Sequence, residues 1–104
     1  MSQTEASLEQ SLDLLLDEDQ AINDEFFIRY TSFFSDLIPT QLKSILKVWD
    51  EIVLTRRHAL LAHLKKELSI DLLYSFEMLG RALLHDKDAI TRSFAIRLLD
   101  DCED

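Results

Sequence analysis

The chain has 104 residues, which is enough for one small domain, and 47% of them are hydrophobic. Glycine and proline occur once each, which argues against an all-β fold because its tight turns need these residues. The net charge of −9 argues against nucleic acid and anionic membranes as partners, because both are bound mainly through lysine and arginine.

The negative charge is concentrated at the two ends of the chain. Residues 1–25 hold eight acidic residues and no basic one, and the last five residues hold four more acids. Cys102 is the single cysteine, so no internal disulfide can form. No basic segment followed by an apolar stretch opens the sequence, and no apolar run approaches the length of a membrane span. We therefore expect a soluble, cytoplasmic protein.

Leucines at helical spacing mark the first element. They are Leu8, Leu12, Leu15 and Leu16. Ser7 and Gln10 are placed to form a capping box at the start of this helix. We predict one helical domain over 1–104, in which residues 1–22 form an acidic N-terminal helix or cap and residues 23–104 form stacked helical hairpins.

An aromatic stripe follows the first helix. Its members are Phe26, Phe27, Tyr30, Phe33, Phe34 and Leu37. We predict a helix over 26–37 with Asn23 or Asp24 as its N-cap. An aromatic stripe can line a ligand pocket, but one continuous face favours a place in the core. Pro39 then begins a third helix, at the position where its missing N–H costs nothing.

Three further helices complete the pattern. Thr55 is the predicted N-cap of the fourth helix, Ser69 or Asp71 begins the fifth, and Asp88 caps the sixth. Gly80 is expected to let a neighbouring helix pack closely. The predicted buried positions of the third, fourth and fifth helices are Leu42, Ile45, Leu46, Trp49, Ile52 and Val53, then Leu60, Leu61, Leu64 and Leu68, then Leu72, Leu73, Phe76, Leu79, Leu83 and Leu84. On the sixth helix, Phe94, Ala95, Leu98 and Leu99 lie on one side. Six helices joined by short turns make an all-α fold of antiparallel neighbours.

The last segment, "DKDAITRSFAIRLLDD", resembles the turn and first helix of a HEAT repeat. The matching positions are Asp86, Asp88, Arg92, Ala95 and the Leu98–Leu99 pair. Thr91 stands where valine is usual in the family. Upstream, residues 37–64 resemble the lead-in of bacterial HEAT-repeat proteins, and the matching positions there are Val48, Trp49, Arg56, Arg57, Leu60, Leu61 and Leu64. The chain therefore resembles the N-terminal portion of such a protein.

The resemblance implies a short α-solenoid, in which helical hairpins stack in a row. In the family the Asp-rich turn caps its helix, the Arg reaches acidic groups of a neighbouring turn, and the Ala lets two helices approach. The last helix would lack a following partner, so we expect an exposed apolar strip covered by another chain or by further sequence. The strip would come from Ile90, Phe94, Ile96 and Leu98.

These features predict a non-enzymatic protein–protein interaction or scaffold module without a cofactor, whose partner is another protein or a second copy of the chain. A basic concentration at 56–66 is either a docking patch for an acidic partner or the solvated face of a helix. The predicted partner-binding residues are Arg56, Arg57, Lys65, Lys66, Ile90, Phe94 and Leu98. The predicted structural repeat residues are Trp49, Asp86, Asp88, Arg92 and Ala95.

Two alternatives compete with this interpretation. The first is a small metal-binding protein that uses the side chains of His58, His63, Glu67 and His85. His63 and Glu67 are four residues apart and can share an ion, but two ligands without a third are weak support. The acidic stretch "DEDQAINDE" lacks the glycine and the ligand spacing of an EF-hand, and no nucleophile motif or phosphate-binding loop occurs. The second alternative is an acidic regulator that occupies a basic partner.

Overall fold

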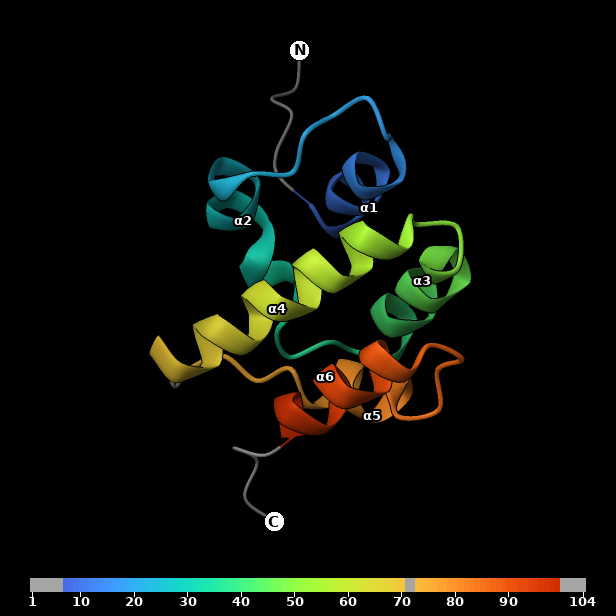
Figure 1. The fold of residues 1–104 in the computed structure, drawn as a ribbon. Helices are drawn as coiled ribbons and strands as arrows, with labels where there is room; N and C mark the ends of the chain where they lie inside the picture. Colours follow the sequence, from blue (N-terminus) through green and yellow to red (C-terminus); the bar gives the residue numbers. More distant parts are fainter. Residues whose placement is uncertain (1–6, 71–72, 100–104) are drawn as a thin grey trace.

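The computed structural model describes residues 7–70 and 73–99 of the chain (Figure 1). Within these residues the fold is all-α, as predicted, with six α-helices, one short 3-10 helix and no strand. The elements are α1 (Leu8–Leu16), α2 (Asp24–Tyr30), η1 (Thr31–Phe34), α3 (Pro39–Trp49), α4 (Leu54–Ile70), α5 (Glu77–Leu83) and α6 (Ala89–Leu99). None of these helices combines the length and the apolar character needed to cross a bilayer.

The first three helices begin where local capping chemistry predicts. The Ser7 hydroxyl accepts a hydrogen bond from the Gln10 N–H at 3.1 Å, and the Asn23 side chain accepts one from the Phe26 N–H at 3.2 Å. Pro39 is the first residue of α3. In each case one residue supplies what the first helical turn lacks, so the sequence alone is sufficient to locate the boundary.

The predicted helix over 26–37 is wrong in its second half. α2 ends at Tyr30 and the chain continues as the 3-10 helix η1. Beyond η1 the backbone N–H of Asp36, a residue with a positive φ of 53°, donates to the Ser75 carbonyl at 2.9 Å. The Ser75 N–H in turn donates to the Ser35 hydroxyl at 2.9 Å. The chain therefore leaves the helix to pair with a loop 40 residues away, which helical periodicity does not encode.

The predicted boundaries of the fourth and fifth helices are also wrong. α4 begins at Leu54, and Thr55 lies inside it rather than at its cap. The Ser69 hydroxyl donates to the Lys66 carbonyl at 2.7 Å, so it is used within α4 and begins no new helix. α5 begins only at Glu77, and Leu73, predicted to be buried, is 86% exposed. The predicted Asp71 and Leu72 positions lie outside the described residues.

α4 occupies the middle of the molecule, with α1 and α2 on one side and α5 and α6 on the other (Figure 1). Its buried face consists of Leu60, Leu61, Leu64 and Leu68, all predicted. The core extends from this face in both directions. Its largest fully buried side chains include Leu15, Phe34, Ile45, Phe76, Leu79, Leu83 and Leu98. Trp49 is buried as well, whereas Leu46, predicted beside it, is exposed.

α5 and α6 pack closely because one residue of α5 has no side chain. A Cβ added to Gly80 would lie 3.2 Å from Leu99 Cδ2 and 3.3 Å from the Ala95 carbonyl oxygen. Ala95 itself is fully buried at this crossing. The predicted role of Gly80 in close helix packing is therefore confirmed, and Ala95 is the small residue opposite it.

Candidate interaction site between helices α4 and α6

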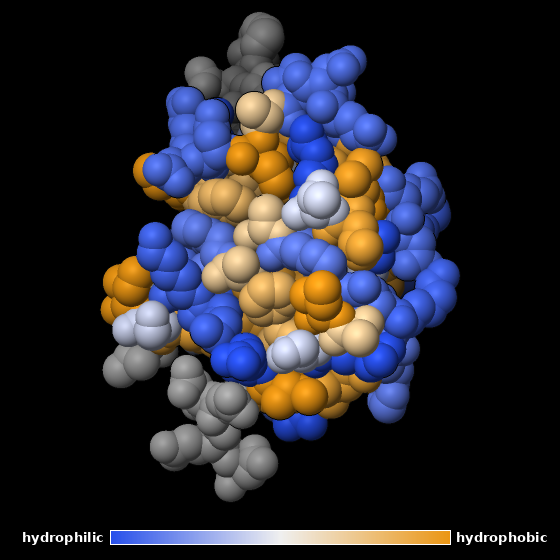
Figure 2. Space-filling view, in the orientation of Figure 1, coloured by the Kyte–Doolittle hydropathy of each residue, from blue (hydrophilic) through white to orange (hydrophobic). Residues whose placement is uncertain are grey.

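A groove of about 400 Å³ runs between α4 and α6. It is lined by Lys65, Ala89, Ile90, Ser93, Phe94 and Arg97. On the face shown in Figure 2, apolar side chains gather where α4 and α6 lie and hydrophilic ones border them. The groove brings together three of the predicted partner-binding residues, Lys65, Ile90 and Phe94, from two helices.

The periodicity of α6 decides which apolar residues reach this groove. Thr91, Ala95 and Leu98 lie at i, i+4 and i+7 and are buried. Ile90, Phe94 and Arg97 follow the same spacing one residue earlier and form the adjacent row. Ile90 is 54% exposed and Phe94 half-buried.

The expected exposed strip is therefore wrong in one member. Leu98 is 1% exposed, because it belongs to the inward row of α6. Ile96 is 55% exposed, as expected, but it is not part of the groove lining. The sequence analysis did not predict Ser93 or Arg97 as groove residues. Helical spacing would have found both, because Arg97 lies seven residues after Ile90 and Ser93 lies four residues before Arg97.

Two cations border the apolar part of the groove. Among the described residues, neither the Lys65 ammonium nor the Arg97 guanidinium forms an ion pair. Lys66, the remaining predicted lysine, is exposed on α4 but does not line the groove. The groove thus combines an apolar surface with positive charge in a chain that is acidic as a whole.

Asp88 connects α6 to α4 at its N-terminus. One carboxylate oxygen, Oδ2, accepts hydrogen bonds from the Thr91 N–H at 2.8 Å, from the Thr91 hydroxyl at 2.9 Å and from His58 Nε2 at 2.7 Å. The hydrogen bond from His58, followed by those from Thr91, lowers the pKa of Asp88 to about 2. Asp88 therefore caps α6 as predicted. The hydroxyl of the buried Thr91 is satisfied by the same carboxylate.

The turn before α6 is held by a second set of bonds. The Asp88 N–H donates to Asp86 Oδ2 at 3.0 Å. Arg92 Nη1 donates to the carbonyls of Asp86 and Lys87 at 2.8 and 3.0 Å. In this chain Arg92 therefore binds the backbone of its own turn, whereas the family resemblance implied acidic groups of a neighbouring turn. The Lys87 ammonium lies 3.4 Å from Asp50 and ties the turn to the end of α3.

Arg56 and Arg57 are engaged inside the chain rather than on an open docking patch. Arg56 donates to the Leu14 and Glu18 carbonyls at 3.2 Å each and to the Gln20 carbonyl. Arg57 Nε donates to the Ile52 carbonyl at 2.9 Å, just past the end of α3. Cationic side chains satisfy unpaired carbonyls at helix C-termini well, which explains both placements. Both arginines therefore make contacts within the chain, and neither lines the groove between α4 and α6.

The histidines proposed for a metal site are used separately. His58 pairs with Asp88, and His63 lies 3.4 Å from Glu67. The His63 ring stacks on Phe27 with centroids 4.2 Å apart, and burial lowers the pKa of His63 while the Glu67 carboxylate opposes that effect. No group of three or more His, Cys, Asp and Glu side chains is close enough to hold a metal ion among residues 7–70 and 73–99. His85 follows α5 in the chain and is exposed, and it joins neither of these pairs.

Trp49, a predicted structural residue, leaves one polar atom without a partner. Its side chain is buried, and in the part of the chain that the structure describes its Nε1–H donates to no acceptor. The apolar contacts of the indole ring therefore account for its place in the core.

Comparisons with protein-family models, with curated proteins and with solved structures gave no match.

Proposed function

We propose that this protein is a non-enzymatic protein-interaction module, and that the groove between α4 and α6 is its docking site. The occupant is a helical segment of a partner protein that carries apolar and acidic side chains. The observation that supports this proposal is one groove that combines an exposed Ile90, a half-buried Phe94 and two cations that form no ion pair with any described residue.

The apolar residues would supply most of the affinity. Full burial of an isoleucine or phenylalanine side chain is worth about 1.5–3 kcal/mol, whereas an exposed ion pair is worth about 0–1 kcal/mol. Lys65 and Arg97 would instead select an acidic segment over a basic one and set its direction in the groove. An apolar groove between two helices is a common receptor for an amphipathic helix.

A HEAT-type stacked arrangement is part of the same proposal. α4 and α6 run in the same direction, from right to left in Figure 1, with the short α5 between them in the chain. Stacked hairpins would produce this succession. The Asp88 cap and the close Gly80–Ala95 contact supply the local geometry that such a repeat needs.

The test is an NMR titration of the protein with two designed helical peptides that share a leucine stripe. In one peptide the remaining positions are mostly glutamate, and in the other mostly lysine. We expect saturable shifts at Lys65, Ile90 and Phe94 with the acidic peptide only.

Ile90→Asp should weaken binding of the acidic peptide at least about tenfold, because it places a carboxylate against the apolar contact. Ile96→Asp is the matched control, since Ile96 lies on the same helix with nearly the same exposure but outside the groove. Equal losses in both variants, or equal binding of the two peptides, would reject the groove as the site. Sedimentation of the protein alone would reveal self-association instead.

A further inference from the structure

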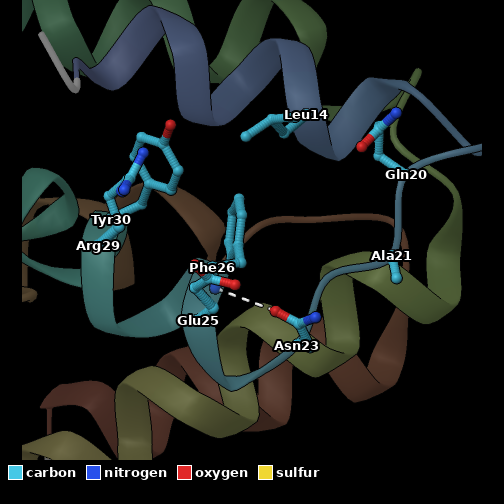
Figure 3. Close-up of a pocket in the computed structure, with 8 residues that line it drawn as sticks. All are labelled: Leu14, Gln20, Ala21, Asn23, Glu25, Phe26, Arg29 and Tyr30. Atoms are coloured by element: carbon cyan, nitrogen blue, oxygen red, sulfur yellow. Dashed lines mark hydrogen bonds between the residues drawn. The ribbon is translucent and has the colours of Figure 1, made fainter.

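A second pocket, of about 320 Å³, lies on the other side of the molecule from α6, between α1, the loop that follows it and α2 (Figure 3). Its volume is at the lower end of the range for small-molecule sites. It is lined by Leu14, Gln20, Ala21, Asn23, Glu25, Phe26, Arg29 and Tyr30. None of these residues belongs to the groove between α4 and α6.

The walls of this pocket are held in place by bonds within the chain. Arg56, from α4, binds three carbonyls along the end of α1 and the following loop, including that of Gln20. The loop carries its own Asx turn, in which Asp17 Oδ1 accepts from the Asp19 N–H at 3.0 Å. Asn23 caps α2 at the other wall, as the dashed line in Figure 3 marks. The pocket therefore exists before any ligand arrives, which lowers the ordering cost of binding.

Tyr30 contributes a hydroxyl group to the pocket lining. The residue is 6% exposed, and its hydroxyl makes no hydrogen bond to any described residue. In Figure 3 the hydroxyl points from α2 toward α1. The hydroxyl is therefore able to donate a hydrogen bond to a polar group in the pocket.

Glu25 and Arg29 contribute the two charged groups of the pocket lining. They lie four residues apart on α2, a spacing at which glutamate and arginine commonly pair with each other. Here they form no ion pair with each other or with another described residue, although both line the pocket. The pocket thus presents one negative and one positive group about one helical turn apart, with no net charge between them.

An apolar surface lies between these polar groups. The Phe26 ring and the Leu14 side chain face each other across the middle of the pocket in Figure 3. The Phe26 ring is itself fixed by Phe27 and Tyr30, whose centroids lie 5.3 and 5.1 Å away. A hydrocarbon group between Phe26 and Leu14 would leave water on entering the pocket.

We infer that this pocket binds a small zwitterion with an apolar body, the chemical class of an α-amino acid with an apolar side chain. Its carboxylate would accept hydrogen bonds from Arg29 and from the Tyr30 hydroxyl, and its ammonium group would donate to Glu25. Its side chain would lie between Phe26 and Leu14. A ligand with only one charge leaves either Glu25 or Arg29 unmatched.

The experiment is an NMR titration of the whole protein with L-leucine and, separately, with two analogues that each lack one charge, 3-methylbutylamine and 4-methylpentanoate. Saturable shifts at Phe26, Arg29 and Tyr30 with leucine, and at least about tenfold weaker binding of both analogues, are expected because each analogue loses one charge-assisted contact. L-Phenylalanine is titrated in parallel as a larger side chain. No saturable shift with either amino acid at millimolar concentration, or equal binding of leucine and an analogue, overturns the inference.

Three variants then assign the contacts. Glu25→Gln and Arg29→Gln should each weaken leucine binding at least about tenfold, and Tyr30→Phe, which keeps the buried ring, should weaken it about threefold to tenfold. Arg97→Gln removes a cation from the other groove and should leave leucine binding unchanged. Equal affinities for the Glu25, Arg29 and Arg97 variants would contradict the proposed site.

Discussion

The two ends of the molecule are attached to the central helix α4 in different ways. On the α6 side, His58 reaches Asp88, a residue that already caps α6 through Thr91. On the α1 side, Arg56 reaches backbone carbonyls at the end of α1 and in the following loop. The contact from His58 reinforces a helix start that the Asp88 cap already establishes locally. The contacts from Arg56 instead hold a loop that no comparable local motif fixes along its whole length.

The geometry of α4 explains how one helix serves both ends. Residues two apart on an α-helix point about 200° apart, so Arg56 and His58 face opposite sides. Each is repeated two turns later, Arg56 by His63, which stacks on Phe27 of α2, and His58 by Lys65, which lines the groove beside α6. Arg56 therefore lies on the face of α4 opposite to His58 and Lys65, and Lys65 lines the groove.

Core truncation in each half should produce the largest effect on stability. Leu15→Ala in α1 and Leu79→Ala in α5 each remove a fully buried side chain, and each should lower the free energy of unfolding by about 2–5 kcal/mol. The measurement is urea unfolding followed by circular dichroism and by the fluorescence of Trp49. Because one core connects the two halves, both probes should report one transition.

Ile28→Ala, at an exposed position of α2, is the control and should change stability by less than about 0.5 kcal/mol. Separate transitions for the two probes would show that the two halves unfold independently and that one shared core does not connect them.

Loss of the Arg56 contacts should come second. Arg56→Met keeps most of the aliphatic stem and removes the guanidinium, so the carbonyls of Leu14, Glu18 and Gln20 lose their donor. We expect a loss of about 1–2 kcal/mol in unfolding free energy. Hydrogen exchange should also accelerate in α1 and its following loop before it accelerates in α6.

Lys66→Met, on the exposed surface of the same helix, is the matched control for Arg56→Met and should have almost no effect. Uniform acceleration of exchange across both halves in Arg56→Met would argue against a local role for the arginine.

The Asp88 network should produce the smallest effect, visible as a dependence on pH. The pKa of Asp88 is about 2 in the folded protein, against 3.8 as the ordinary value, so the folded state favours the carboxylate. Its contribution to stability is therefore complete above about pH 3.8 and is lost as the pH falls toward about 2. Unfolding free energies across this range should converge for the native protein and Asp88→Asn as the pH falls.

Asp13→Asn, at an exposed position of α1, is the matched comparison for Asp88→Asn. A constant difference between Asp88→Asn and the native protein down to about pH 2 would mean that Asp88 acts through its shape and not through its charge.

Local chemistry explains which parts of the candidate site were predictable. Asp88 and Ile90 were found because a cap and an exposed position at helical spacing depend on residues within one or two turns. Leu98 was assigned wrongly because its position on α6 does not say which side α5 and α4 occupy. The pocket between α1 and α2 was not foreseen, since Leu14, Gln20 and Tyr30 come from three segments that only packing brings together.

By itself the sequence determined that the fold is all-α, where most of its helices begin, and that Gly80 lies at a close helix crossing. These properties depend on hydrogen bonds and steric limits within a few residues. The tertiary structure alone decided where α2 ends, how far α4 extends, and on which side of α4 each basic residue acts. Those outcomes depend on contacts between distant residues, such as Ser35 with Ser75 and Arg56 with Leu14. The spacing of residues within one helix does not predict the free energy of such contacts.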